Sequence, residues 1–137
     1  MLNYFYVAIG SAVGGLARLM IGLWLQERLG HWMPHAGAKP FPVGTLLVNA
    51  SGSLLIGVLI VVMARQPDRA NAIQYLLVVG LCGGYTTFST FSADTVALLE
   101  SGGAALAALN VAASLALAFA ATFAGFALAR AAVGGST

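Results

Sequence analysis

Four long apolar segments dominate this chain and limit what it can fold into. They cover residues 4–25, 43–64, 72–99 and 103–133. Each reaches the length of about 20 apolar residues that a helix needs to cross a bilayer. Only 7% of the residues are charged, against about 25% in a soluble domain, so a water-facing surface cannot be built. The sequence therefore predicts an all-α integral membrane protein, with four transmembrane helices in a single membrane domain over residues 1–137.

The rest of the composition argues against several classes of function. A net charge of +2 is too small to indicate a nucleic-acid partner, and the single cysteine, Cys82, allows no disulfide within the chain. The N-terminal segment has no charged region and no cleavage site, which favours a first span over a removed signal peptide. Pro34 interrupts the spacing of His31 and His35, so we expect no metal centre there. No nucleotide-binding, zinc-protease or catalytic-triad motif is present, and we expect no enzyme.

The basic residues show no bias between the two sides of the predicted membrane. An even number of spans places both termini on one side, with Arg65, Arg69 and Arg130, and leaves Arg18, Arg28 and Lys39 for the other. The bias that normally sets orientation is therefore absent. A small chain of this kind is expected to insert both ways round and to assemble as an antiparallel, dual-topology homodimer. Since no internal repeat is visible, any inverted symmetry must come from two copies.

The segment GGYTTFSTFS, residues 83–92, is the most polar part of the third span. Its two glycines weaken a helix, and its five hydroxyl side chains compete for backbone hydrogen bonds. Thr86 falls at the midpoint of the span, where irregular backbone is tolerated only inside protein or beside water. We therefore expect the third helix to be broken at the midplane, unwound from Gly83 to Thr86, with freed carbonyls that can bind a cation. A plain packing face of small residues is the alternative.

Polar residues also form stripes on the second and fourth spans. The stripes consist of Thr45, Asn49 and Ser53, and of Asn110 and Ser114, each four residues apart and so on one helix face. Phe88 and Phe91, three residues apart, can present electropositive ring edges from one face of the third span. A path lined in this way could carry an anion without a lysine that would hold it too tightly. Interhelical hydrogen bonds and apolar packing are the alternatives.

Two ionisable residues fall within the spans. An intramembrane charge indicates function by default, but Arg18 is close enough to the end of the first span to extend its side chain to the interface. Asp94 is expected near the aqueous end of the third span.

Three sequence blocks resemble the bacterial fluoride channels of the Fluc (CrcB) family. They are GGLAR at residues 14–18, PVGTLLVNASGS at 42–53 and GLCGGYTTFSTFSAD at 80–94. The third block is highly specific. The order and spacing of the four spans match as well, so the resemblance covers nearly the whole chain.

The resemblance implies a channel of the bacterial inner membrane that lets fluoride leave the cytoplasm passively and so confers fluoride resistance. Its partners would be fluoride, membrane lipid and a second copy, in an antiparallel homodimer with two pores. The implied pore residues are Asn49, Phe88, Phe91, Thr45 and Ser114, and Arg18 would sit in a vestibule. The backbone carbonyls of Gly83 and Thr86 would bind a structural sodium ion on the two-fold axis.

Several features depart from the family or fit another class. The loop at residues 26–41 is longer than the family leads us to expect, and Ala118 stands where a second hydroxyl often follows Ser114. Asn110 occupies a variable position.

A small dual-topology multidrug or cation transporter is the alternative, but it needs a membrane-embedded acid, and Asp94 is the only candidate. A structural subunit without transport would not need a midplane break beside two ring edges and an amide.

Overall fold

The protein is described by a computed structural model that covers residues 2–65 and 70–134. Four helices in it are long and apolar enough to cross a membrane, which confirms the four-span prediction. The elements, in order, are α1 (Leu2–Leu29), η1 (Gly30–Trp32), β1 (His35–Ala36), β2 (Lys39–Pro40), α2 (Val43–Ala64), α3 (Ala70–Ile73), the π-helix η3 (Gln74–Cys82), α4 (Gly83–Tyr85), α5 (Phe88–Glu100) and α6 (Ala104–Gly134). Arg69, one of the six basic residues counted by side, lies outside the described residues.

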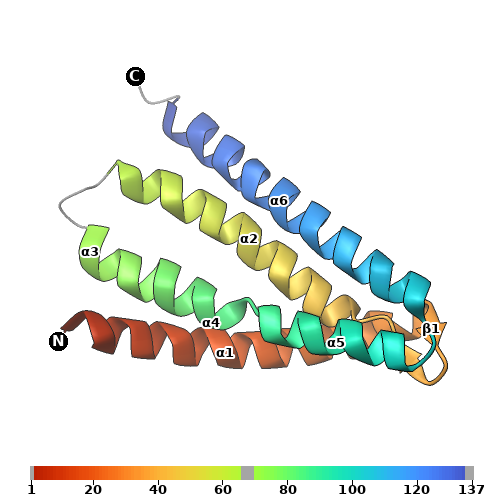
Figure 1. Cartoon of the computed structure of the whole chain (residues 1–137). Coiled ribbons are helices and arrows are strands. Elements are labelled where there is room, and N and C mark those ends of the chain that lie inside the picture. The colour runs from red at the N-terminus through yellow and green to blue at the C-terminus, as the bar shows by residue number, and fades with distance from the viewer. Residues whose placement is uncertain (1, 66–69, 135–137) are drawn as a thin grey trace.

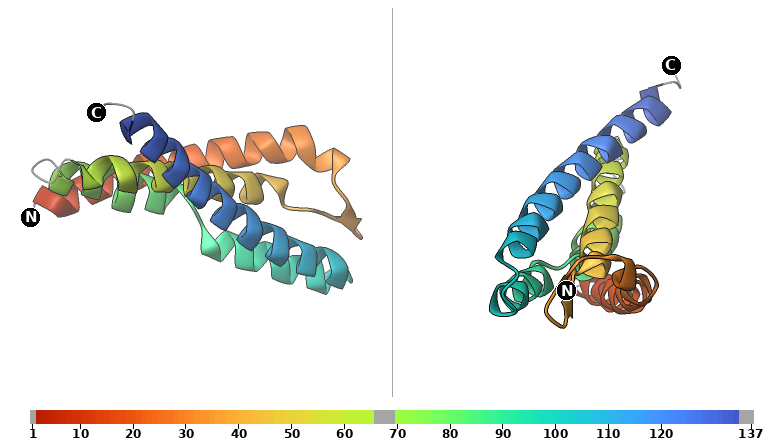
Figure 2. Two further views of the ribbon diagram at one scale, coloured as in Figure 1. Left: turned by 90° about the horizontal axis from the view of Figure 1, so that it is seen from above. Right: turned by 90° about the vertical axis from the view of Figure 1, so that its right-hand side faces the viewer.

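The spans run alternately up and down, so α1 begins and α6 ends at the same end of the bundle (Figure 1). Helix α2 packs against α6 and α1, and α1 packs against η3 and α4. Figure 2 shows α6 crossing α2 at an angle, with α5 set apart from the α3–α4 half of its span. The third span is therefore divided between two directions.

Small residues let the helices approach closely. A methyl group on Gly57 or Gly125 would meet the backbone of the facing helix at the α2–α6 crossing. A methyl group on Gly10 or Gly14 of α1 would likewise meet the backbone of η3. Because lipid supplies no hydrophobic force between helices, contacts of this kind are a principal source of their association.

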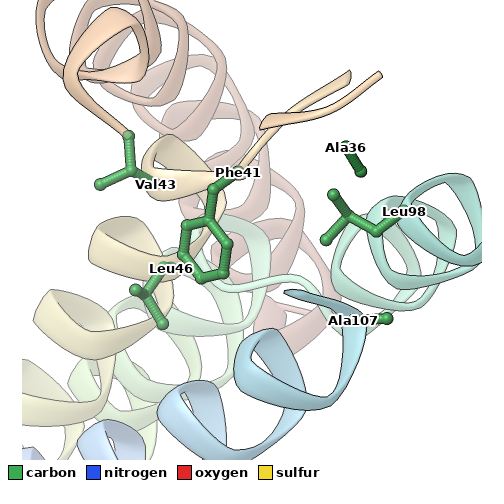
Figure 3. Packing of buried hydrophobic residues seen from close by; sticks show 6 residues of the cluster. All are labelled: Ala36, Phe41, Val43, Leu46, Leu98 and Ala107. Carbon is green, nitrogen blue, oxygen red and sulfur yellow. The ribbon is translucent and has the colours of Figure 1, made fainter. Parts of the chain in front are cut away.

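The loop between α1 and α2 is folded rather than open. Strands β1 and β2 pair antiparallel, and Gly37 between them has a φ of 57°, which glycine adopts at no steric cost. Ala36 and Phe41 belong to a buried cluster with Val43, Leu46, Leu98 and Ala107 (Figure 3). The long loop thus forms a hairpin that packs on the ends of α2, α5 and α6.

The non-helical residues of the third span are Thr86 and Thr87. Their backbone is extended, with ψ of 155° at Thr86 and 117° at Thr87. Gly83 and Gly84 remain helical, so the expectation that unwinding starts at the glycines is wrong. Gly84 instead allows the backbone of Ser11 to approach closely. The side chain of Thr87 accepts a hydrogen bond from the backbone of Thr90, and this N-cap is the physical reason why α5 starts where it does.

Candidate functional site

A groove of about 400 Å³ runs along α2, η3, α5 and α6. We call it the phenylalanine groove; its lining includes Asn49, Ser53, Gly83, Thr86, Thr87, Phe88, Phe91, Ser114 and Ala118. The structure thus brings together most of the residues that the sequence singled out, from three different spans. Thr45 and Arg18, which the resemblance assigned to the pore and its vestibule, lie outside this groove, as do Asn110 and Asp94. Ala118 also lines the groove, so the position at which the resemblance led us to expect a hydroxyl carries a methyl group here.

Asn49 joins the second span to the extended part of the third. Its Nδ2 donates to the carbonyl of Thr87 at 3.0 Å, and the backbone N–H of Thr87 donates to its Oδ1 at 2.7 Å. The amide therefore replaces the backbone partners that Thr87 lacks outside a helix. An asparagine amide carries two N–H donors, and the second N–H of Asn49 has no hydrogen-bond partner among the described residues. The interhelical hydrogen bond and the groove-lining position, which the sequence left as alternatives, occur together.

The two phenylalanines lie on the first turn of α5. Their ring centroids are 5.4 Å apart and their planes are inclined by 52°. Both rings line the groove, and Phe88 is 76% exposed in the single chain. Tilted rings of this kind present edges as well as faces, and the edges carry the positive end of the ring quadrupole.

Among the residues that the structure describes, none with a charged side chain lines the phenylalanine groove. Its polar groups are the Asn49 amide, the hydroxyls of Ser53, Thr86, Thr87 and Ser114, and the Cys82 thiol. These groups offer partial charges only. Such a surface can replace part of an ion's hydration shell without trapping the ion.

A second hollow, of about 320 Å³, lies between α1, β2, α2 and α5. We call it the hairpin cavity; its polar lining includes Arg18, Gln26, Lys39, Thr45, Thr90 and Asp94. Thr87 lines both hollows, so they are neighbours at this braced part of the backbone. Within the described part of the chain, the hairpin cavity, unlike the groove, is lined by the charged side chains of Arg18, Lys39 and Asp94.

Arg18 and Thr45 both make hydrogen bonds at the hairpin cavity. The Nε of Arg18 donates to the carbonyl of Gly84 at 3.2 Å, and the hydroxyl of Thr45 donates to Asp94 at 2.9 Å. Asp94 is also paired with Lys39, at 3.1 Å. The stripe of Thr45, Asn49 and Ser53 on α2 therefore runs from one hollow into the other.

Asn110 does not belong to the polar path. It is 1% exposed and donates to the hydroxyl of Thr95, which donates in turn to the carbonyl of Phe91. Neither hollow includes Asn110 in its lining. The stripe expected on the fourth span is thus divided: Asn110 binds α6 to α5, while Ser114 lines the groove.

Two residues of the site were not singled out individually. Thr87 carried a usable signal, because a threonine that starts a helical segment is a common N-cap. Lys39 carried no such sequence signal, because it is separated from Asp94 by 55 positions in the chain and only the folded hairpin places the two side by side.

A four-span membrane protein with a polar groove and a neighbouring charged cavity has the parts of an ion pathway. Residues 5–126 match the family described as "CrcB-like protein, Camphor Resistance (CrcB)". The chain belongs to this family, and it is a multi-pass membrane protein.

Relatives carry a more specific name. The chain is 43% identical over 130 residues to the "Fluoride-specific ion channel FluC" of Agrobacterium fabrum, covering 95% of the chain and 98% of that relative. A Rhizobium etli protein of the same name is 38% identical over 133 residues, covering 97% and 100%. One from Methylococcus capsulatus is 43% identical over 129 residues, 94% of the chain but only 53% of that longer relative. The family resemblance is confirmed, and so is the expectation that the chain is no enzyme.

We predict that replacing Asn49 with leucine destabilises the extended turn. Leucine keeps the branched shape at Cγ but leaves the N–H and C=O of Thr87 without partners, at about 1–3 kcal/mol each. The variant should unfold in detergent at a lower denaturant concentration than the parent. The backbone amide hydrogen of Thr87 should also exchange faster with solvent. Ser53→Ala, one turn along the same face of the groove, is the matched control. A variant as stable as the parent, with a protected Thr87 amide, would contradict the role of Asn49 as a brace.

Proposed function

We propose that this chain is a fluoride-selective channel that lets fluoride leave the bacterial cytoplasm passively. The observation that carries the proposal is the phenylalanine groove, whose lining, within residues 2–65 and 70–134, offers amide, hydroxyl and ring-edge contacts but no charged side chain. A fixed cation in such a path would hold an anion too tightly to release it. The name that the relatives share supports fluoride as the ion.

The proposed route passes from the hairpin cavity to the phenylalanine groove by way of Thr87. Arg18 and Lys39 would attract the anion into the cavity, since both line it. At Thr87 the remaining N–H of Asn49 would donate to the ion. Further along, the ring edges of Phe88 and Phe91 and the hydroxyl of Ser114 would replace water around it. Thr45 would act at the entrance, through its bond to Asp94.

We propose that a second, antiparallel copy covers the groove. In the single chain Phe88 is exposed and Gly83 has open space beyond its Cα. Irregular backbone in a membrane must be buried in protein or line a watery cavity, so lipid cannot cover the extended residues Thr86 and Thr87. Two copies related by a two-fold axis in the membrane would close two grooves and form two pores. The interruption of the third span would then lie at the midplane.

A sodium ion at the contact between the two copies is part of this proposal. Thr87 directs its N–H to Asn49, not to the carbonyl of Gly83. Among the described residues, no hydrogen bond reaches the carbonyls of Gly83 or Thr86. Unpaired carbonyls are costly in hydrocarbon, and hard cations prefer oxygen ligands, so these groups fit a bound cation. Its charge would offset the carbonyl dipoles and hold the two copies together.

The transporter alternative gains no support from the site. A proton-coupled transporter needs an acid that is free to exchange protons in the membrane. Asp94, the only candidate, is paired with Lys39 and accepts a hydrogen bond from Thr45. It lines the hairpin cavity rather than the groove.

The experiment that tests the proposed function is ion efflux from liposomes that contain the purified protein. We predict rapid fluoride efflux and little chloride efflux, because the groove is matched to a small anion. Phe88→Ile and Phe91→Ile should each reduce fluoride efflux by about tenfold or more, since an aliphatic side chain has no positive edge. Equal fluoride and chloride rates would contradict selectivity, and two fully conducting variants would place the path elsewhere.

A second prediction concerns sodium. Replacing sodium on both sides of the liposome with a large organic cation, after long dialysis, should abolish fluoride efflux and weaken the dimer. Thr86→Val serves as the control, because it removes a hydroxyl that already bonds to the carbonyl of Cys82 but keeps the Thr86 carbonyl. Unchanged efflux and an unchanged dimer without sodium would show that no such ion is required.

A further inference from the structure

Lys39 reaches the hairpin cavity from β2, in the loop between α1 and α2. Its Nζ lies 3.1 Å from one oxygen of Asp94, and the other oxygen accepts the hydroxyl of Thr45 at 2.9 Å. The side chains of Lys39 and Asp94 are 34% and 17% exposed. One contact therefore joins the hairpin to α2 and α5 at the wall of the cavity.

The carboxylate of Asp94 presents a difficulty for an anion in this cavity. Thr87, Thr90 and Asp94 follow each other at spacings of three and four along α5 and line the same hollow. An unpaired carboxylate at that place would repel an anion on its way to Thr87. The charged groups that line the cavity with Asp94 are Arg18 from α1 and Lys39 from β2; α2 contributes the uncharged Thr45.

We propose that Lys39 makes the hairpin cavity permissive for anions by neutralising Asp94. The inference rests on the proposed function, because it assigns Lys39 to the entry of the same anion. With Lys39 present, two cations and one carboxylate line the cavity, and the net charge is positive. Without it, Arg18 alone opposes the carboxylate and is itself held by the carbonyl of Gly84. The hairpin thus places a positioning residue for ion entry.

Fluoride efflux from liposomes tests the inference, at low fluoride so that entry limits the rate. We expect Lys39→Gln to conduct about tenfold more slowly than the parent. The deficit should shrink when an impermeant salt raises the ionic strength, because salt screens a partly exposed charge. Lys39→Arg should restore most of the rate. Arg28→Gln, which removes the same charge from an exposed position at the end of α1, should conduct like the parent.

The double variant Lys39→Gln/Asp94→Asn separates charge from structure. If Lys39 acts by neutralising the carboxylate, the double variant should recover to within about threefold of the parent. If the pair only anchors the hairpin, Lys39→Gln, Asp94→Asn and the double variant should all lose activity to a similar extent. That result would overturn the inference. The double variant also covers the case in which Lys39→Gln alone fails to assemble, as judged by size-exclusion chromatography.

The outcome for the parent distinguishes the two proposals. A parent that releases no fluoride refutes the proposed function. A parent that conducts, beside a Lys39→Gln variant of equal rate at low salt, refutes only the role of Lys39. A deficit in Lys39→Gln that does not change with ionic strength also refutes charge compensation.

Discussion

The two hydrogen bonds between Asn49 and the backbone of Thr87 are the constraint on which the rest of the site depends. Extended backbone inside a membrane span is stable only when its polar groups have partners. The amide supplies both partners, and the N-cap of Thr87 then restarts the helix. The residue at which α5 begins determines which of its side chains face each hollow. Phe88 and Phe91 line the groove, whereas Thr90 and Asp94 line the hairpin cavity.

In the proposed channel, this arrangement would separate the attraction of an anion from its passage. Arg18, Lys39 and Asp94 line the hairpin cavity, which is built partly from the loop between α1 and α2, whereas no charged side chain in the described part of the chain lines the phenylalanine groove. Attraction of an anion falls off slowly with distance, while binding at contact is strong. Charges near the entrance can therefore raise the local concentration of an anion without retaining it in the narrow part. Under this proposal, ring edges and a single amide donor would then make only weak contacts with the ion.

The four spans could be predicted from the sequence, because they follow from the length of the apolar segments. The groove residues Asn49, Ser114 and the two phenylalanines could be predicted as well, because they are polar or aromatic residues at helical spacing. Other features depend on tertiary contacts. Gly83 and Gly84 stay helical since Gly84 serves the close approach of α1, and unwinding falls on Thr86 and Thr87 because Asn49 is there to bind Thr87. Spacing alone could not show that Asn110 faces Thr95. The pairing of Lys39 with Asp94 depends on a hairpin that hydropathy does not reveal.

The account depends most on the claim that two antiparallel copies meet across their grooves, and disulfide cross-linking in a Cys82→Ala background tests it directly. Gly83→Cys lies on the open face of the groove, so it should link two copies readily if that face is the contact. Ala38→Cys, in the exposed turn of the hairpin, should not, because antiparallel copies place their hairpins on opposite sides of a hydrocarbon core about 30 Å thick. Linking at Ala38, or none at Gly83 under conditions that preserve the dimer, would contradict the account.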